Sequence, residues 1–210
     1  RDLHSFPTRR SSDLPTDITF KIMIFALHNM LRFVSNIVPL LEINKQTMTR
    51  IGLLSDTHSY WDDKYLKYFE ECDEIWHAGD IGSVEVAERL AAFRPFRAVY
   101  GNIDGQEIRK LYPQINRFTV DGAEVLMKHI GGYPGNYDPS IRGSLFVKPP
   151  KLFISGHSHI LKVKYDKTLG LLHINPGAAG KSGFHTVRTL VRFVIDQGEF
   201  KDLEVIELAE

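Results

Sequence analysis

The stretch that decides the fold reads Ile51-Gly52-Leu53-Leu54-Ser55-Asp56-Thr57-His58. A short apolar run that ends at once in polar residues is typical of a buried strand that delivers its last side chains to a loop. Residues 74–78 repeat this pattern and end at Gly79-Asp80, and residues 96–100 end at Gly101-Asn102. The sequence therefore predicts consecutive buried strands with polar side chains at their ends.

Helices and antiparallel hairpins are predicted around these strands. Residues 63–71 have helical content, and residues 83–93 form an amphipathic pattern with Ser83 suited to the N-cap. Asp121-Gly122 is a favoured hairpin turn. Further strands are predicted at 116–120, 123–128, 152–155, 171–174, 186–195 and 201–208, the last two joined around Gln197-Gly198. Strand–helix alternation followed by antiparallel strands favours an α/β fold of two packed sheets with helices outside.

The composition narrows the class of protein. The 210 residues are 43% hydrophobic and 25% charged, which are ordinary globular values and argue against disorder, collagen and coiled coil. The formal net charge is zero, so the chain lacks the excess of basic residues that is expected of a general nucleic-acid binder. The single cysteine, Cys72, excludes an internal disulfide and fits a reducing compartment. We expect a cytoplasmic protein without a membrane segment or a long nucleic-acid partner.

The first 47 residues differ from the rest of the chain. Residues 4–14 resemble the in-frame translation of a common sequencing-adapter oligonucleotide. We therefore expect residues 1–47 to be an extension outside the domain, with Met48 as the natural start. The rival interpretation is a targeting or membrane segment, but the apolar run at 22–27 is far shorter than the about 20 residues of a span. Residues 48–210 would then form the domain, with 20 basic and 22 acidic residues.

Five predicted strands end in side chains that commonly bind metal ions. These candidates are Asp56, His58, Asp80, Asn102, His129, His157 and His159. In open α/β sheets the ligand site lies beyond the carboxyl ends of the strands, so these side chains can converge. Imidazoles mixed with carboxylates suit Mn, Fe, Zn or Ni rather than Mg or Ca alone. So many ligands suit two ions about 3.5–4 Å apart that share a bridging carboxylate.

Taken singly, each motif has a simpler structural explanation. An Asp after a strand is more often a turn former or a helix cap. Two histidines in one tight loop, His157 and His159, are more informative, and coincidence explains the ordered set poorly. For the remaining residues we expect structural roles: His77 in the core or supporting the ligands, His173 and His185 without ligand partners, Cys72 without a nucleophilic role, and Tyr133, Asn136 and Tyr137 as solvated loop residues.

The ordered set resembles the calcineurin-like metallophosphoesterases, in particular their compact YfcE-type phosphodiesterase branch. The family pattern stands here as Asp56-Thr57-His58, Gly79-Asp80, Gly101-Asn102-Ile103-Asp104, His129 and Gly156-His157-Ser158-His159, followed by Asn175-Pro176-Gly177. The resemblance implies a four-layer αββα sandwich with two mixed β-sheets flanked by helices. It also implies that Asp56, His58 and His159 hold a first metal ion and that Asn102, His129 and His157 hold a second, with Asp80 bridging both.

The resemblance further implies hydrolysis of a phosphate ester by a hydroxide held between two divalent ions, with Mn²⁺ favoured over Ni²⁺, Fe²⁺ or Zn²⁺. Asp80 and Asn102 would belong to the catalytic set, and Asn102 would also contact the substrate. Ile103 stands where many relatives have a His that protonates the leaving oxygen. This departure favours diesters or activated esters over alkyl monoesters. Asp104 would orient His157 or His159, or donate the proton itself.

The expected function is a metal-dependent phosphodiesterase that hydrolyses a small phosphodiester, such as a cyclic or linear nucleotide. The alternative is a non-catalytic, protein-binding scaffold that resembles a retromer subunit. All seven ligand positions are filled in this chain, which argues against the scaffold. A nuclease of the same superfamily is a third hypothesis, but the chain lacks the basic patch that long polymers require. The sequence leaves open whether the domain forms a homo-oligomer.

Overall fold

The computed structural model describes residues 27, 30 and 48–209. Residues from Thr47 to Glu210 form one compact unit, and its fold is the subject of this section. The expectation that residues 1–47 are an extension lies outside the described residues, apart from Leu27 and Met30. Within the described part of the chain, no helix combines the length and the apolar character needed to cross a membrane.

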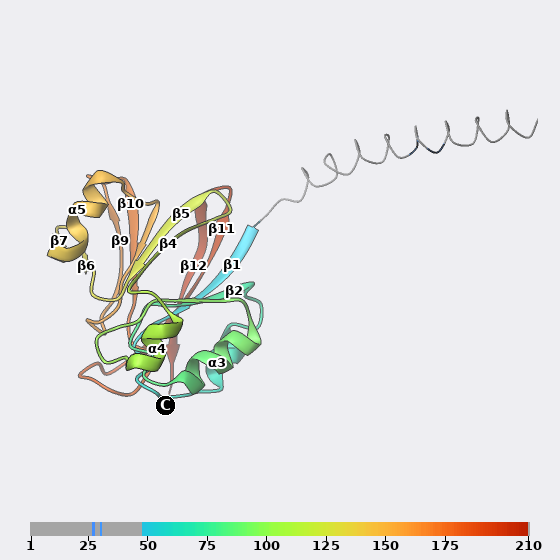
Figure 1. Cartoon of the computed structure of the whole chain (residues 1–210), viewed down its shortest axis with the longest axis vertical. Helices are drawn as coiled ribbons and strands as arrows, with labels where there is room; N and C mark the ends of the chain where they lie inside the picture. The colour runs from blue at the N-terminus through green and yellow to red at the C-terminus, as the bar shows by residue number, and fades with distance from the viewer. Residues whose placement is uncertain (1–26, 28–29, 31–47, 210) are drawn as a thin grey trace, which may run out of the picture. The chain divides into compact units, whose positions relative to one another are not determined.

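The first of two five-stranded sheets has the strand order β12-β11-β1-β2-β3 (Figure 1). Its strands are β1 (Met48–Leu54), β2 (Glu74–His77), β3 (Phe96–Ala98), β11 (Arg188–Asp196) and β12 (Glu199–Leu208). The strands β1, β2 and β3 run parallel, whereas β11 is antiparallel to both β1 and β12. The sheet is therefore mixed, and its three parallel strands all end at the same edge.

The second sheet has the order β4-β5-β8-β10-β9. Its strands are β4 (Ile115–Val120), β5 (Ala123–Lys128), β8 (Leu152–Ile154), β9 (Leu161–Asp166) and β10 (Leu171–Pro176). Here β5, β8 and β10 run parallel, and β4 and β9 pair antiparallel at the two outer edges. A separate two-stranded ribbon joins β6 (Gly132–Tyr133) to β7 (Asn136–Tyr137).

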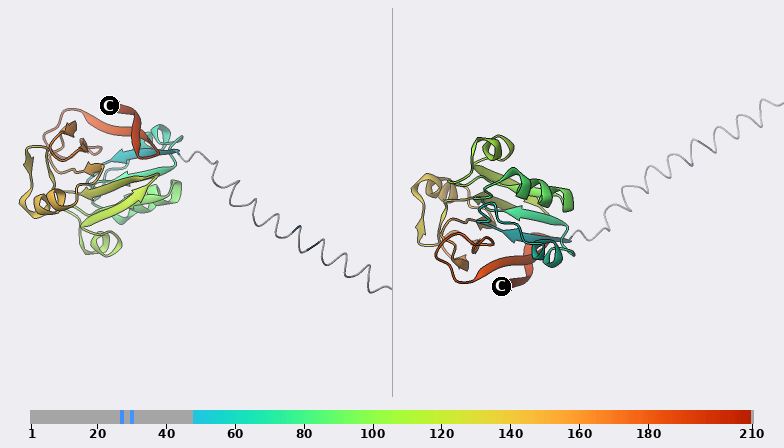
Figure 2. Two further views of the ribbon diagram at one scale, coloured as in Figure 1. Left: turned by 90° about the horizontal axis from the view of Figure 1, so that it is seen from above. Right: turned by 90° about the horizontal axis from the view of Figure 1, so that it is seen from below.

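Helices cover the outer face of each sheet (Figures 1 and 2). Three of them pack on the first sheet: α2 (Lys64–Tyr68), α3 (Val84–Phe93) and α4 (Gln106–Leu111). The fourth, α5 (Pro139–Val147), packs on the second sheet. This order confirms the predicted four-layer αββα sandwich. In α3, Ser83 caps the helix by accepting from the Val86 N–H, as its sequence indicated.

The strand pattern of β1 shows how the layers are held together. Successive side chains of a strand point to opposite faces, so Ile51 and Leu53 pack between the sheets while Leu54 packs under the helices. Across the sandwich, the Trp76 ring lies 5.0 Å from the Phe118 ring of the second sheet, and within its own sheet it lies 5.8 Å from the Phe193 ring, measured between centroids. Burial of each such side chain contributes about 1.5–3 kcal/mol, which fixes the two sheets face to face.

Both predicted hairpin turns are confirmed. Asp121 and Gly122 have φ angles of 43° and 79° and connect Val120 directly to its cross-strand partner Ala123. Gln197 and Gly198 have φ angles of 50° and 84°. Two-residue turns with positive φ at both positions match the right-handed twist of the flanking strands.

Five elements of the described chain lie outside the sequence predictions: α4, α5, β9 and the two short strands β6 and β7. The helix α5 begins at an Asp-Pro pair, in which the Asp138 carboxylate accepts from the Ser140 N–H at 2.9 Å and Pro139 occupies the first turn. That pair is a helix-start signal because proline lacks the N–H that a first turn leaves unpaired. The strand β9 escapes prediction because it is an edge strand with mostly exposed side chains on both faces.

Candidate metal centre

The predicted ligands follow strands that end at neighbouring edges of the two sheets. The loops after β1, β2 and β3 come from the first sheet, and those after β5 and β8 from the second. They carry Asp56 and His58 (after β1), Asp80 (β2), Asn102 (β3), His129 (β5), and His157 and His159 (β8). Parallel strands place these loops on one side of each sheet, as the ligand-site rule for α/β sheets requires.

A first group of donors consists of Asp56, His58 and His159. The Asp56 Oδ1 atom lies 3.2 Å from Nε2 of His159 and 4.0 Å from Nε2 of His58. The two Nε2 atoms are themselves 3.3 Å apart. One carboxylate oxygen and two imidazole nitrogens thus face a common point, which is a donor set suited to a transition-metal ion.

A second group consists of Asp80, His129 and His157. The Asp80 Oδ2 atom lies 3.2 Å from Nε2 of His129. It also lies 3.7 Å from Nε2 of His58, which belongs to the first group. Asp80 therefore sits between the two groups, in the place that a bridging carboxylate occupies.

The donors fit a cation because two of their buried atoms have no other partner. Asp56 Oδ1 and His129 Nε2 are buried, lie 3.9 Å apart and accept or donate no hydrogen bond among the described residues. An unsatisfied buried polar atom costs about 1–3 kcal/mol, and a metal ion in each donor group would satisfy one of these two atoms. The opposite atoms of the same side chains are already held, because His129 Nδ1 donates to the Ala78 carbonyl at 2.8 Å and Asp56 Oδ2 accepts from the His157 N–H at 3.2 Å.

The pKa values of these groups report how strongly they attract a positive charge. Burial lowers the pKa of His129, but the carboxylates of Asp80 and Asp56 raise it further, so that the net shift is upward. The Asp56 carboxylate likewise raises the pKa of His159. Burial raises the pKa of Asp80, whereas His129 and the Ile103 N–H lower it by more. The carboxylates thus favour a cation here, either protons on the imidazoles or a bound metal.

Backbone strain is concentrated at the same loops. Five predicted ligands have positive φ angles between 49° and 68°, namely Asp56, His58, Asp80, His157 and His159. The left-handed conformation costs a non-glycine residue roughly 1–2 kcal/mol, so folds retain it where geometry matters more than local stability. Here it turns the side chains of tight loops toward the shared centre.

Two glycines make this close approach feasible. A Cβ atom on Gly156 would lie 2.2 Å from Ser55 Oγ and 3.0 Å from Asp56 Oδ2. A Cβ atom on Gly101 would lie 2.0 Å from Asp80 Oδ1. Any larger residue at either position would push a carboxylate out of the donor set.

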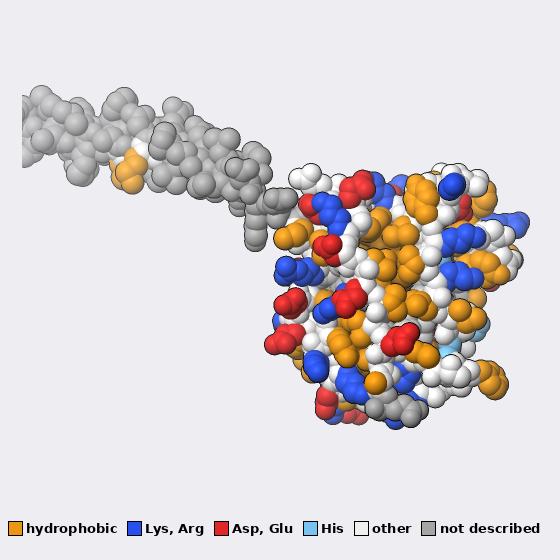
Figure 3. Space-filling model, turned by 180° about the vertical axis from the view of Figure 1, so that it is seen from behind, with side chains coloured by type: hydrophobic (Ala, Val, Ile, Leu, Met, Phe, Trp, Pro, Cys, Tyr) orange, Lys and Arg blue, Asp and Glu red, His pale blue; other side chains and the backbone are white. Residues whose placement is uncertain are grey.

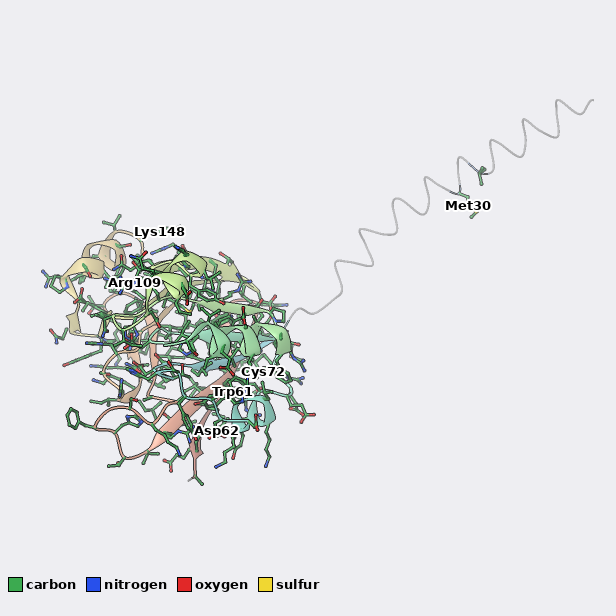
Figure 4. All side chains as sticks on the ribbon, turned by 60° about the horizontal axis from the view of Figure 1, so that its bottom comes forward. Met30, Trp61, Asp62, Cys72, Arg109 and Lys148 are labelled. Carbon is green, nitrogen blue, oxygen red and sulfur yellow. The ribbon has the colours of Figure 1, made fainter. Side chains whose placement is uncertain are left out.

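Asn102 lies at the side of the second group. It is exposed, and it lines a cavity of about 330 Å³ together with His129, Lys128 and Arg109. The backbone carbonyl oxygen of Asn102 accepts from the Arg109 guanidinium at 3.2 Å (Arg109 is labelled in Figure 4). The role of the Asn102 side chain as a metal ligand stays a prediction.

The expected contact of Asp104 with His157 or His159 is wrong. Asp104 is buried, and its two carboxylate oxygens accept from the N–H groups of Gly82 and Gly101, each at 2.7 Å. Among the described residues no hydrogen bond joins it to either histidine. Asp104 therefore ties the loops after β2 and β3 to each other, and both of its oxygens are engaged rather than free to carry a proton to a substrate.

The expectation that His185 has no ligand partner is wrong, because this residue contacts the predicted ligand His159. Its Nδ1 atom lies 3.2 Å from Nδ1 of His159, and its Nε2 donates to the Gly180 carbonyl at 3.0 Å. No local pattern announces this contact, because 26 residues separate His159 from His185. His77, by contrast, supports the ligand loops as expected: it is buried, and its Nε2 lies 2.9 Å from the Thr57 hydroxyl.

Two further expectations concern residues outside the donor groups. Tyr137 is buried and donates to Asp166 at 2.6 Å, so it is not a solvated loop residue. It leaves the solvent because β7 folds back onto the second sheet and α5 follows it. Cys72 (labelled in Figure 4) is buried, and burial raises the pKa of its thiol to about 11, which agrees with the absence of a nucleophilic role.

The sequence profile of the calcineurin-like phosphoesterase superfamily domain matches residues 49–198. The chain belongs to this superfamily. The match spans every predicted ligand and all but the last strand of the sandwich. The chain is similar to a probable metallophosphoesterase of Methanothermobacter thermautotrophicus, with 29% identity over 136 residues that cover 61% of this chain and 76% of the relative.

Solved structures share the calcineurin-like fold at low sequence identity. One is a novel archaeal phosphodiesterase, with 22% identity, coverage of 76% of this chain and 99% of the other, and a TM-score of 0.60. Another is wild-type Vps29 of Entamoeba histolytica complexed with Zn²⁺, with 15% identity, coverage of 75% and 98%, and a TM-score of 0.55. These likenesses support the fold, which carries both a phosphodiesterase and a vacuolar sorting protein.

Proposed function

We propose that this domain is a two-metal phosphodiesterase that acts on a small phosphodiester. The position of Asp80 carries the proposal, because its Oδ2 atom lies within 3.7 Å of a histidine from each donor group. The unpartnered atoms of Asp56 and His129 add support from both groups. Membership of the calcineurin-like superfamily agrees with hydrolysis of a phosphate ester.

The chain would hold its ions with residues from both sheets. Asp56, His58 and His159 would hold one divalent ion, and His129, His157 and Asn102 the other, with Asp80 between them. Bound divalent ions lower the pKa of water, orient the phosphate and neutralise charge on the attacking and leaving oxygens. A donor set of imidazoles and carboxylates favours Mn²⁺, Fe²⁺, Ni²⁺ or Zn²⁺, and we propose Mn²⁺ as the first ion to test.

The residue after Asn102 points to diesters. Ile103 is 45% exposed, and its N–H donates to Asp80 Oδ1 at 3.0 Å, so its backbone supports the centre while its side chain offers no proton. General acid catalysis is typically worth 10²–10⁴-fold. A chain without an acid at this position should therefore hydrolyse esters with good leaving groups, such as aryl diesters, faster than alkyl monoesters.

A non-catalytic scaffold is the second candidate function, favoured only by the fold shared with Vps29. A scaffold has no need of strained backbone at five ligand positions or of unpartnered buried donors. We therefore place it behind the enzyme, as the outcome that a failed activity test would promote.

The test uses the full chain. Bound metal per chain is measured after incubation with Mn²⁺ and desalting, and hydrolysis of bis-p-nitrophenyl phosphate is followed with and without Mn²⁺. We expect about two ions per chain and turnover that Asp80→Asn abolishes. The matched control is Asp196→Asn, since Asp196 is also a buried carboxylate but lies beside Met48, at the opposite end of β1. No bound metal and no turnover would reject the proposal in favour of the scaffold.

A further inference from the structure

Exposed isoleucines directly follow three of the predicted ligands. Ile103 follows Asn102, Ile130 follows His129 and Ile160 follows His159, with exposed fractions of 45%, 37% and 62%. Tyr133 and Phe184 are also exposed, and Phe184 lines a cavity with His157, His159 and Ile160. We call these five residues the apolar rim: Ile103, Ile130, Tyr133, Ile160 and Phe184. Apolar side chains that gather around a polar centre mark a binding surface, because covering them removes apolar area from water.

One cavity is shared by the rim and the metal centre. It has a volume of about 300 Å³, and its lining includes His157 of the second donor group and three residues of the apolar rim, Ile130, Tyr133 and Ile160. On the face shown in Figure 3, histidine side chains lie at one edge among hydrophobic ones. A substituent of a phosphate group held at the centre would enter this cavity directly.

The walls of the cavity are fixed before any ligand binds. Lys162 lies over the Tyr133 ring, with its Nζ 3.6 Å from the ring centroid. Tyr137 is tied by its hydroxyl to Asp166, and the Ser158 hydroxyl accepts from the Asn175 side chain at 3.1 Å. A preformed pocket with apolar walls and a few oriented polar groups is the usual form of a small-molecule site.

We propose that this cavity binds an aromatic ring, an aryl group or a nucleobase, carried by the non-reacting ester group of the substrate; the proposal rests on the proposed phosphodiesterase function. The volume lies at the lower end of small-molecule pockets, which span about 300–1,000 Å³, so it suits one compact group rather than a polymer or a long acyl chain. Tyr133, Ile130 and Ile160 offer apolar surface for a flat ring.

The test compares substrates that share one leaving group. Full-chain enzyme with Mn²⁺ is assayed on methyl, phenyl and thymidine 5′-esters of p-nitrophenyl phosphate, so that the chemistry of the departing nitrophenolate stays constant. Binding is measured separately, without turnover, as the dissociation constants of methylphosphonate and phenylphosphonate from calorimetric titration of the chain with Mn²⁺. Aromatic stacking contributes roughly tenfold or more per ring, so we expect the phenyl and thymidine esters to exceed the methyl ester in kcat/KM by about that factor. Phenylphosphonate should bind more tightly than methylphosphonate by a similar factor.

Two variants separate the cavity from the rest of the surface. Tyr133→Ser should bring both ratios close to one. Tyr165→Ser is the matched control, because Tyr165 is a 58% exposed tyrosine on β9 and does not line this cavity; it should leave both ratios intact. A preference for thymidine over phenyl would assign the ring to a nucleobase, and equal rates would assign it to any aryl group.

The outcomes distinguish this proposal from the one on which it rests. Turnover of all three esters at equal kcat/KM, with equal dissociation constants of both phosphonates, overturns the aromatic site and keeps the phosphodiesterase. If none of the esters is hydrolysed, the proposed function fails, and the phosphonate ratio alone then supports or rejects the cavity. A ratio that Tyr133→Ser leaves unchanged also rejects it.

Discussion

The Nδ1 atom of His185 lies 3.2 Å from the Nδ1 atom of His159. The other nitrogen of His185 donates to the Gly180 carbonyl, so its hydrogen is on Nε2 and Nδ1 is left as an acceptor. His159 then donates through Nδ1, which leaves the lone pair of its Nε2 facing Asp56 and the first donor group. A hydrogen-bond partner on the far nitrogen fixes the tautomer and orientation of a metal-binding histidine.

His185→Phe keeps the ring but removes its acceptor, so His159 loses its orienting partner. We expect the affinity for Mn²⁺ to fall by about 10–100-fold, the usual effect of such a partner. Competition against a chelating dye measures this without recourse to activity. His185→Gln, which retains an acceptor, should recover part of the affinity; a Gln variant as weak as the Phe variant would contradict the role of the acceptor.

Gly156 should tolerate no side chain, in contrast to Gly143 in helix α5. Gly156→Ala places a methyl group 2.2 Å from Ser55 Oγ, so we expect a loss of metal binding and a lower free energy of unfolding. Gly143→Ala is the matched control, because Gly143 lies in α5 with nothing within 4 Å of its added Cβ. Urea denaturation should show that the control stabilises the domain by up to about 1 kcal/mol. Equal effects of the two changes would contradict the close packing around Asp56.

Asp104→Asn tests whether Asp104 is structural. An asparagine has one acceptor oxygen for two N–H donors, so one of the bonds to Gly82 and Gly101 must break. Loss of a buried bond to a charged group should lower the free energy of unfolding by about 1.5–3 kcal/mol. The pH–rate profile should keep its shape, and disappearance of its alkaline limb alone would instead identify Asp104 as the proton donor.

His173 should make stability depend on pH. It is buried, and burial lowers its pKa from the ordinary 6.5 to about 4, with Lys162 adding to the effect. The unfolded chain therefore binds a proton as the pH falls through 6.5, while the folded chain does so only near 4. The free energy of unfolding should fall across this window by up to about 1.4 kcal/mol per pH unit from this group. His173→Gln should flatten the slope in urea titrations between pH 7 and pH 5; an unchanged slope would assign the effect to other groups, such as the equally buried His77.

Local patterns were enough to predict most of the architecture. Apolar runs of strand length, an amphipathic helix with a Ser cap and two turn dipeptides each depend on residues that are neighbours in the chain, and β1, α3 and both hairpins follow from them. The donor groups were predictable for a related reason. Polar residues at the ends of parallel strands must meet at one edge, whatever the details of packing, so Asp56, Asp80 and His129 come together.

The contacts that the sequence left open join residues that are distant along the chain and carry no local pattern. His185 meets His159, Tyr137 meets Asp166 and Asp104 meets Gly82 across gaps of 26, 29 and 22 residues. Each depends on how one loop packs against another after the two sheets close. The order and type of the metal donors are thus determined by the sequence of the strands and their ends. The orientation of the donors and the shape of the cavity beside His157 arise from packing in the folded chain. Hydrogen-bond and van der Waals energies act over only a few ångströms, so these contacts exist only once folding has brought distant residues together.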